Sequence, residues 1–170
     1  MKGKPLSQAQ AKLKLALTQA EADTVSNSDL YVMLQELGLP SEVALRLHQL
    51  ISYTQQIGDK IFSIGKIIVI KIIDFIKAHP NLFVGAALGA AVGSLVNAVP
   101  ALGPILSPLA TAIASAFGAV VGHRMDKKGK KEEVYEGIIG LTENAIEIAK
   151  VFFELLIEIF STVYKSEFVV

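Results

Sequence analysis

Hydrophobic and polar residues follow a helical period along much of the chain. From 41 to 79 there is no proline, and the charged and polar side chains fall within an arc of roughly 140° on a helical projection. Gly58 and Gly65 interrupt this stretch, either as points of close packing or as a weak hinge. A second stretch, from 132 to 170, carries glutamates along a narrow stripe. The spacing therefore predicts two long antiparallel amphipathic helices.

A segment without charge separates these two predicted helices. The 46 residues from Ala78 to His123 contain no Lys, Arg, Asp or Glu. Prolines near the middle divide the segment into two apolar helices, near 81–99 and 105–122. Each would hold ~18 residues and extend ~27 Å, close to the ~30 Å hydrocarbon thickness of a bilayer. We therefore expect an apolar helical hairpin over residues 80–123.

Small residues repeat every four positions on both predicted helices of the hairpin. They are Gly85, Gly89 and Gly93 on the first helix and Ala110, Ala114, Gly118 and Gly122 on the second. Such a repeat, a glycine zipper, lets two helix backbones approach closely, as membrane helices do when they pack. We therefore expect these seven residues to form helix contact faces.

The first 40 residues predict a small helical cap. A polar helix over 7–24 and a short helix over 29–36 are separated by turn-forming residues. Packing on the rest of the chain is the simpler expectation for this cap, and a docking role is the alternative.

The charged residues are few, and they lie in separate segments of the chain. Of the 170 residues, 52% are hydrophobic and 19% charged, and sixteen basic residues balance sixteen acidic ones. This excludes a disordered chain and leaves no net field that would attract nucleic acid. The chain has no cysteine, so it forms neither disulfides nor thiolate metal sites.

Basic residues cluster immediately after the hairpin, in a predicted loop over 124–131. They are Arg124, Lys127, Lys128, Lys130 and Lys131. Because the run adjoins an apolar helix, contact with anionic lipid headgroups is one interpretation, and a solvated loop is the other.

Glutamates form the stripe of the last predicted helix. Those with a candidate role are Glu143, Glu147, Glu154 and Glu158. The stripe either faces solvent, with salt bridges to lysines of the 41–79 helix, or lines a pore. The sequence leaves both interpretations open.

The segment from Pro80 to Arg124 resembles known proteins at the level of class. A charge-free hairpin between amphipathic helices is similar to that of pore-forming colicins and α-helical pore-forming toxins. The glycine repeats resemble the glycine-zipper segments of small bacterial membrane proteins, and phage proteins that build DNA-ejection channels share this glycine-rich helical character. The resemblance implies membrane insertion and oligomerisation, and it brings no catalytic residues. The chain is too short for all the helices of a colicin pore domain.

These patterns predict an all-α protein that inserts into membranes as a homo-oligomer and forms a pore or channel, of toxin, defence-effector or phage-ejection type. The positive-inside rule places it in the cytoplasmic membrane with both termini in the cytoplasm, and a soluble form before insertion stays open. The alternative is a soluble structural or interaction protein that buries the hairpin in an oligomer. The three histidines are isolated and no catalytic motif occurs, so we expect no enzyme, cofactor, metal, nucleic acid or small-molecule substrate.

Overall fold

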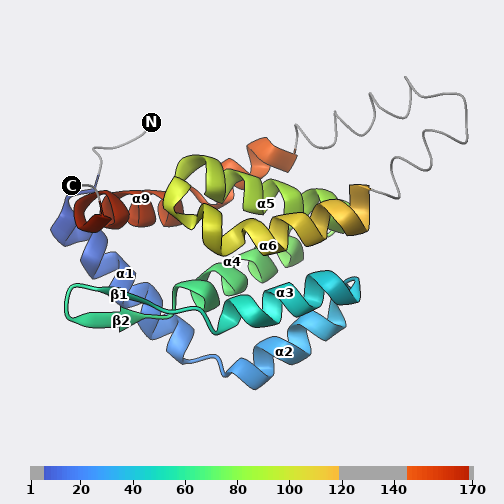
Figure 1. Ribbon diagram of the computed structural model, residues 1–170, viewed down its shortest axis with the longest axis horizontal. Helices are drawn as coiled ribbons and strands as arrows, with labels where there is room; N and C mark the ends of the chain where they lie inside the picture. Colours follow the sequence, from blue (N-terminus) through green and yellow to red (C-terminus); the bar gives the residue numbers. More distant parts are fainter. Residues whose placement is uncertain (1–5, 119–144, 169–170) are drawn as a thin grey trace, which may run out of the picture.

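The computed structural model of the chain describes residues 6–118 and 145–168. These residues form helices and one small β-hairpin, which confirms the predicted all-α class (Figure 1). The elements in chain order are α1 (Gln8–Asp23), α2 (Asn27–Glu36), α3 (Ser41–Ile51), β1 (Gln55–Ile57), β2 (Lys60–Phe62), α4 (Ile64–Ala78), α5 (Val84–Ala98), η1 (Pro100–Leu102), α6 (Gly103–Ile113), η2 (Ala114–Gly118) and α9 (Glu154–Phe168). Residues 145–152 are also helical and lead into α9.

The N-terminal helices form as predicted and join the common core. α1 begins with a capping box, in which Ser7 Oγ accepts a hydrogen bond from Gln10 N at 3.1 Å and Gln10 Oε1 accepts one from Ser7 N at 3.0 Å. Leu15 of α1 and Leu30 of α2 are both buried, at 0% and 1% exposure. Residues 6–40 are therefore part of one packed body.

The predicted continuous helix over 41–79 is wrong, because a β-hairpin divides it. α3 ends at Ile51, β1 and β2 pair antiparallel, and α4 begins at Ile64. Gly58 has a φ of 66° and occupies the first position of the two-residue turn, where a type II′ turn requires a positive φ. Gly58 is therefore a turn residue.

Gly65 is the point where α3 and α4 approach closely. Its backbone N donates a hydrogen bond to Tyr53 O at 3.1 Å. A Cβ atom added to Gly65 would overlap the backbone carbonyl of Leu50 at the end of α3. Of the two interpretations of this glycine, close packing is the correct one.

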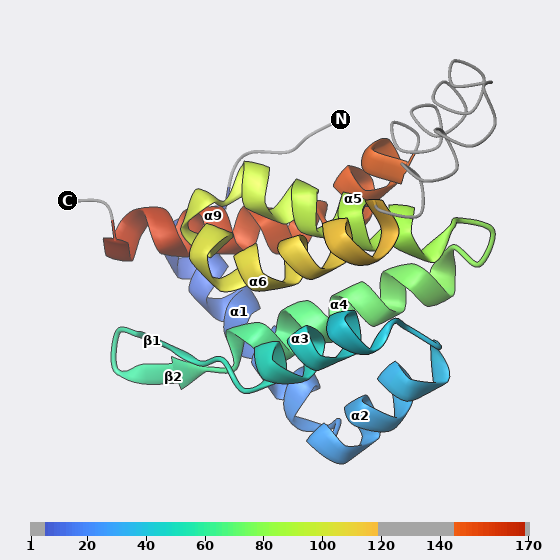
Figure 2. The ribbon, with the colours of Figure 1, turned by 45° about the vertical axis from the view of Figure 1, so that its right-hand side comes forward.

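The helices form layers around α4. Figures 1 and 2 show α5 and α6 on one side of the molecule and α2 and α3 on the other. α4 packs on both α5 and α3, and α6 also packs directly on α3. Nine of the 15 residues of α4 are buried, among them Ile68, Val69 and Phe75 at 0% exposure. α4 is thus the centre of the core.

The C-terminal segment packs on α4 through aromatic rings. Phe75 of α4 lies 5.2 Å from the ring of Phe152 and 5.5 Å from that of Phe153. Lys71 of α4 lines a small cavity with Thr18 of α1. The expected facing of this lysine toward the C-terminal glutamates is therefore wrong, because Lys71 lies against α1.

Tyr164 gives α9 a pH dependence that can be measured. Its side chain is 6% exposed, and burial raises the pKa of its phenol above the ordinary value of 10, with a further contribution from Tyr53. Above about pH 10 the unfolded chain therefore binds fewer protons than the folded chain, and stability falls as pH rises. We expect urea unfolding at about pH 8 and about pH 11 to show a smaller loss for Tyr164→Phe than for the parent. Equal losses would contradict this role of Tyr164.

Candidate functional site

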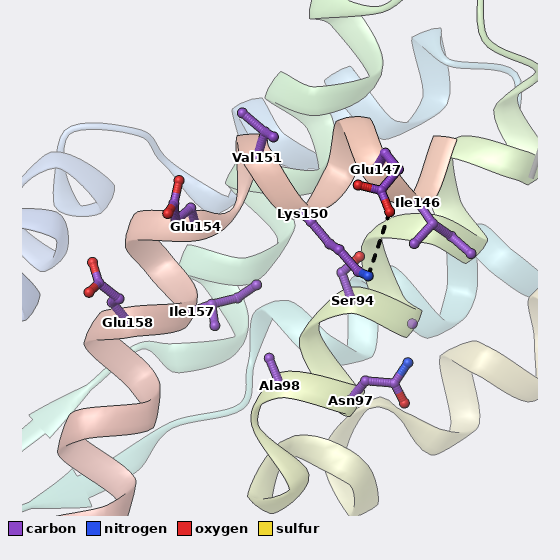
Figure 3. Close-up of a pocket in the computed structure, with 11 residues that line it drawn as sticks. Ser94, Asn97, Ala98, Ile146, Glu147, Lys150, Val151, Glu154, Ile157 and Glu158 are labelled. Carbon is purple, nitrogen blue, oxygen red and sulfur yellow. Dashed lines mark ion pairs between the residues drawn. The ribbon is translucent and has the colours of Figure 1, made fainter. Parts of the chain in front are cut away.

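A groove of about 600 Å³ lies between α5 and the C-terminal segment (Figure 3). One wall is the second half of α5, and the other, here called the C-terminal wall, is formed by residues 146–158. The lining residues are Gly93, Ser94, Asn97 and Ala98 of α5 and Ile146, Glu147, Lys150, Val151, Glu154, Ile157 and Glu158 of the C-terminal wall. Beyond one end of the groove, Ser161 Oγ donates a long hydrogen bond to Ala98 O at 3.5 Å.

The groove is open because the glycine face of α5 has no neighbour there. A Cβ atom at Gly89 or Gly93 would meet no atom within 4 Å among the described residues. Gly85 is different, since a Cβ atom there would lie 2.6 Å from the ring of Phe117. Of these three glycines, therefore, only Gly85 makes the helix contact that was predicted for the hairpin. Gly89 and Gly93 face no other described residue.

The second predicted small face is largely at the surface. Ala110 and Ala114 are exposed, and Gly118 ends η2. Gly122 lies outside the described residues. Ala110 and Ala114 therefore do not form the predicted contact face within one chain. Their exposed positions leave room for a partner outside the chain.

Ser94 carries an unsatisfied hydroxyl in the wall of the groove. The residue is 6% exposed, and in the described part of the chain its Oγ has no hydrogen-bond partner. A buried hydroxyl without a partner costs about 1–3 kcal/mol. Figure 3 shows Ser94 and Asn97 on α5, with Lys150 and Ile157 reaching toward them from the opposite wall. The groove therefore combines apolar and charged lining residues with one buried hydroxyl that lacks a partner among the described residues.

The glutamate stripe meets this groove at its outer edge. Glu147 pairs with Lys150 at 3.8 Å, and the side chains are 75% and 61% exposed, so the pair adds little stability. Glu154 and Glu158 form no ion pair with any residue the structure describes, and they lie along the outer edge of the C-terminal wall. Glu143 lies outside the described residues. A pore-lining role for this stripe stays a prediction about an assembly.

The headgroup-binding prediction falls on residues that the structure does not describe. All five basic positions belong to residues 119–144, which are not described: Arg124, Lys127, Lys128, Lys130 and Lys131.

One helical segment is long and apolar enough to cross a membrane. It runs from Pro100 to Phe117, has 18 residues and a mean hydropathy of 1.4, and only 28% of it is buried. α5 is apolar but has 15 residues, or about 22 Å of helix, which is shorter than the predicted span. The exposed side of the longer segment carries prolines, alanines and the hydroxyls of Ser107, Thr111 and Ser115.

The sequence reasoning missed most of the groove's lining. Ser94 and Asn97 are rare polar residues within an apolar helix, and this spacing of three was the signal available. Ile146 and Ile157 belong to a helix that is apolar on several sides, so the residues facing α5 could not be selected.

The described part of the chain holds no cluster of metal ligands. Residues 6–118 and 145–168 contain no group of three His, Asp or Glu side chains that could hold a metal ion. The chain also matches no protein-family model, no curated protein and no solved structure.

Proposed function

We propose that this protein inserts into membranes through its α5–α6 hairpin and acts there as an oligomer that forms a pore or channel. The observation that carries the proposal is the Pro100–Phe117 segment, which is apolar, uncharged and 28% buried. A core helix of a soluble protein with this composition is mostly buried. The exposed, uncharged surface of α6 instead suits a bilayer.

The contrast with α4 supports this proposal. α4 buries nine of its 15 residues, whereas α6 buries four of its 11. The chain thus has one apolar helix at its centre and another at its surface. Exposed apolar patches mark sites of interaction with membranes or other proteins, and the exposed side of α6 carries no charge.

The way the hairpin is held also supports insertion. Among the described residues, one side-chain hydrogen bond, from Ser161 Oγ to Ala98 O at 3.5 Å, links the hairpin to another element. The hairpin has no charged residue, so its release from α3, α4 and α9 breaks no ion pair. In the bilayer, packing against lipid chains and other helices replaces the apolar packing of the hairpin against α3, α4 and α9.

Topology and location follow from the flanking charge. Lys77 precedes the hairpin and the basic run after Arg124 follows it. Under the positive-inside rule these ends stay in the cytoplasm, so the proposal places the protein in the cytoplasmic membrane with both termini inside. Lipid is then the first partner and further copies of the chain the second.

The hydroxyls of Ser107, Thr111 and Ser115 favour a second candidate function. These hydroxyls lie on the exposed side, where they can hydrogen-bond to water, so the surface is compatible with a soluble protein. A soluble interaction protein that covers α6 in an oligomer is the alternative, and flotation with liposomes distinguishes the two.

A lysine at the centre of the apolar segment tests insertion. Ala110 is exposed, so Ala110→Lys leaves the folded chain intact, while a lysine at the middle of a membrane span costs about 2.5–3.5 kcal/mol. We expect flotation with anionic liposomes to fall about 100-fold and dye release with it. Ala110→Leu, which adds bulk without charge, and Val32→Lys, which adds the same charge on α2, should float like the parent. Equal flotation of Ala110→Lys and the parent, or a parent that stays in solution as a defined oligomer, would overturn insertion.

A further inference from the structure

We infer that copies of this protein assemble head to tail, with the outer face of α6 in one copy packed into the α5 groove of the next. The outer face of α6, which continues into η2, consists of Ser107, Ala110 and Thr111 of α6 and Ala114 and Ser115 of η2, all of them exposed. The inference rests on the proposed function only in that it names the contact by which the oligomer forms. The contact joins folded copies before insertion, when α5 still packs beside the C-terminal wall and the groove between them exists.

Ser94 is the observation that points to an occupant of the groove. It is 94% buried, lines the groove and has no hydrogen-bond partner for its Oγ within the described chain. The outer face of α6 presents three hydroxyls at a spacing of four residues, each able to donate to or accept from such a group. Serine and threonine hydroxyls of this kind hydrogen-bond between helices packed through small residues.

Shape and size agree with this occupant. Gly89 and Gly93 place no side chain between α5 and an approaching helix, and nothing in the described residues lies within 4 Å of their Cβ positions. From Ser107 to Ser115 the outer face of α6 is about 12 Å long, and the C-terminal wall from 146 to 158 is about 18 Å long. A ridge of small side chains therefore fits within the length of the C-terminal wall.

Charge selects the same partner. The α6 face has no charged residue, so it enters the apolar floor of the groove without burying a charge beside Glu147. Glu154 and Glu158 also line the groove, and Figure 3 shows their side chains on the side of the C-terminal wall away from Ser94 and Asn97. Because the two joined surfaces differ, the contact is heterologous, and it builds a ring when the rotation closes.

Disulfide trapping between copies tests the contact. The chain has no cysteine of its own, so only the introduced cysteines can form a disulfide. Asn97→Cys and Thr111→Cys are made in separate full-length chains, mixed, and oxidised with and without anionic liposomes. We expect a mixed disulfide dimer several-fold more abundant than in a mixture of Asn97→Cys with Val32→Cys, in which the second cysteine lies on α2. A mixed dimer no more abundant than this control, or an equal yield from Asn97→Cys alone, would overturn the head-to-tail contact.

Ser94→Ala separates this contact from a structural role of the serine. Removal of an unpartnered buried hydroxyl leaves the unfolding midpoint of the single chain unchanged or higher, while the mixed disulfide yield and the oligomer fraction fall several-fold. Unchanged assembly in Ser94→Ala would overturn the pairing of Ser94 across the contact. Flotation and dye release without the mixed disulfide would refute the contact and leave the proposed function standing. The mixed disulfide in a chain that never floats would support the contact and refute insertion.

Discussion

Gly65→Ala is expected to lower the free energy of unfolding by about 3 kcal/mol, because the added methyl group has no room. A Cβ atom there overlaps the backbone carbonyl of Leu50 and lies 3.0 Å from Cβ of Tyr53. Backbone atoms cannot rotate away as the end of a side chain can, so α3 and α4 must move apart. Urea denaturation followed by circular dichroism measures the change.

Gly89→Ala is the matched control on another helix. No described atom lies within 4 Å of the added Cβ, and alanine is the better helix former by about 1 kcal/mol. We therefore expect Gly89→Ala to raise the free energy of unfolding by up to about 1 kcal/mol. If both variants unfolded at the urea concentration of the parent, the close approach at Gly65 would be refuted.

The hydrophobic period identifies helices but does not say which of them lies inside. α4 and the hairpin are both strongly apolar, and in the folded chain α4 forms the core while α6 stays at the surface. The burial of a helix depends on which other helices pack against it, and the sequence of that one helix does not show this. The glycine repeat has the same limit, because Gly85 contacts Phe117 while Gly89 and Gly93, on the same face, contact nothing described.

The break between α3 and α4 shows where local chemistry overrides a helical period. Ser52, Gln56 and Asp59 fit the polar arc of a helix, yet Gly58 takes a φ of 66° and turns the chain into a β-hairpin. Ile57 and Phe62 are buried while Ile61 is 68% exposed, a pattern too short to predict a strand. Packing of the β-hairpin against the helices therefore decides that these residues form strands.

The groove could be predicted only in part for a similar reason. The glycines and the glutamates were recognisable as stripes, and the structure brings Gly93, Glu154 and Glu158 to one groove. Their meeting depends on the packing of residues 145–158 beside α5, which follows from contacts distant in sequence. The unpaired hydroxyl of Ser94 is visible only once its neighbours are known.

Phe153→Ala is expected to lower the free energy of unfolding by about 3–5 kcal/mol, since it empties the centre of an aromatic cluster. Phe153 has 0% exposure, and its ring lies 5.5 Å from that of Phe75 and 5.4 Å from that of Phe152. The cluster ties the C-terminal wall to α4, so the same change should reduce the mixed disulfide between Asn97→Cys and Thr111→Cys chains. Urea denaturation measures the first effect and the trapping yield the second.

Val151→Ala provides the comparison on the same wall. Val151 is 72% exposed and lies two positions before Phe153, so its truncation creates no cavity and should change stability by less than about 0.5 kcal/mol. Phe153→Leu keeps most of the buried volume and should recover part of the loss, because only the ring contacts are missing. A Phe153→Ala variant as stable as Val151→Ala would mean that the C-terminal wall is not held by this cluster, and the groove would then need another support.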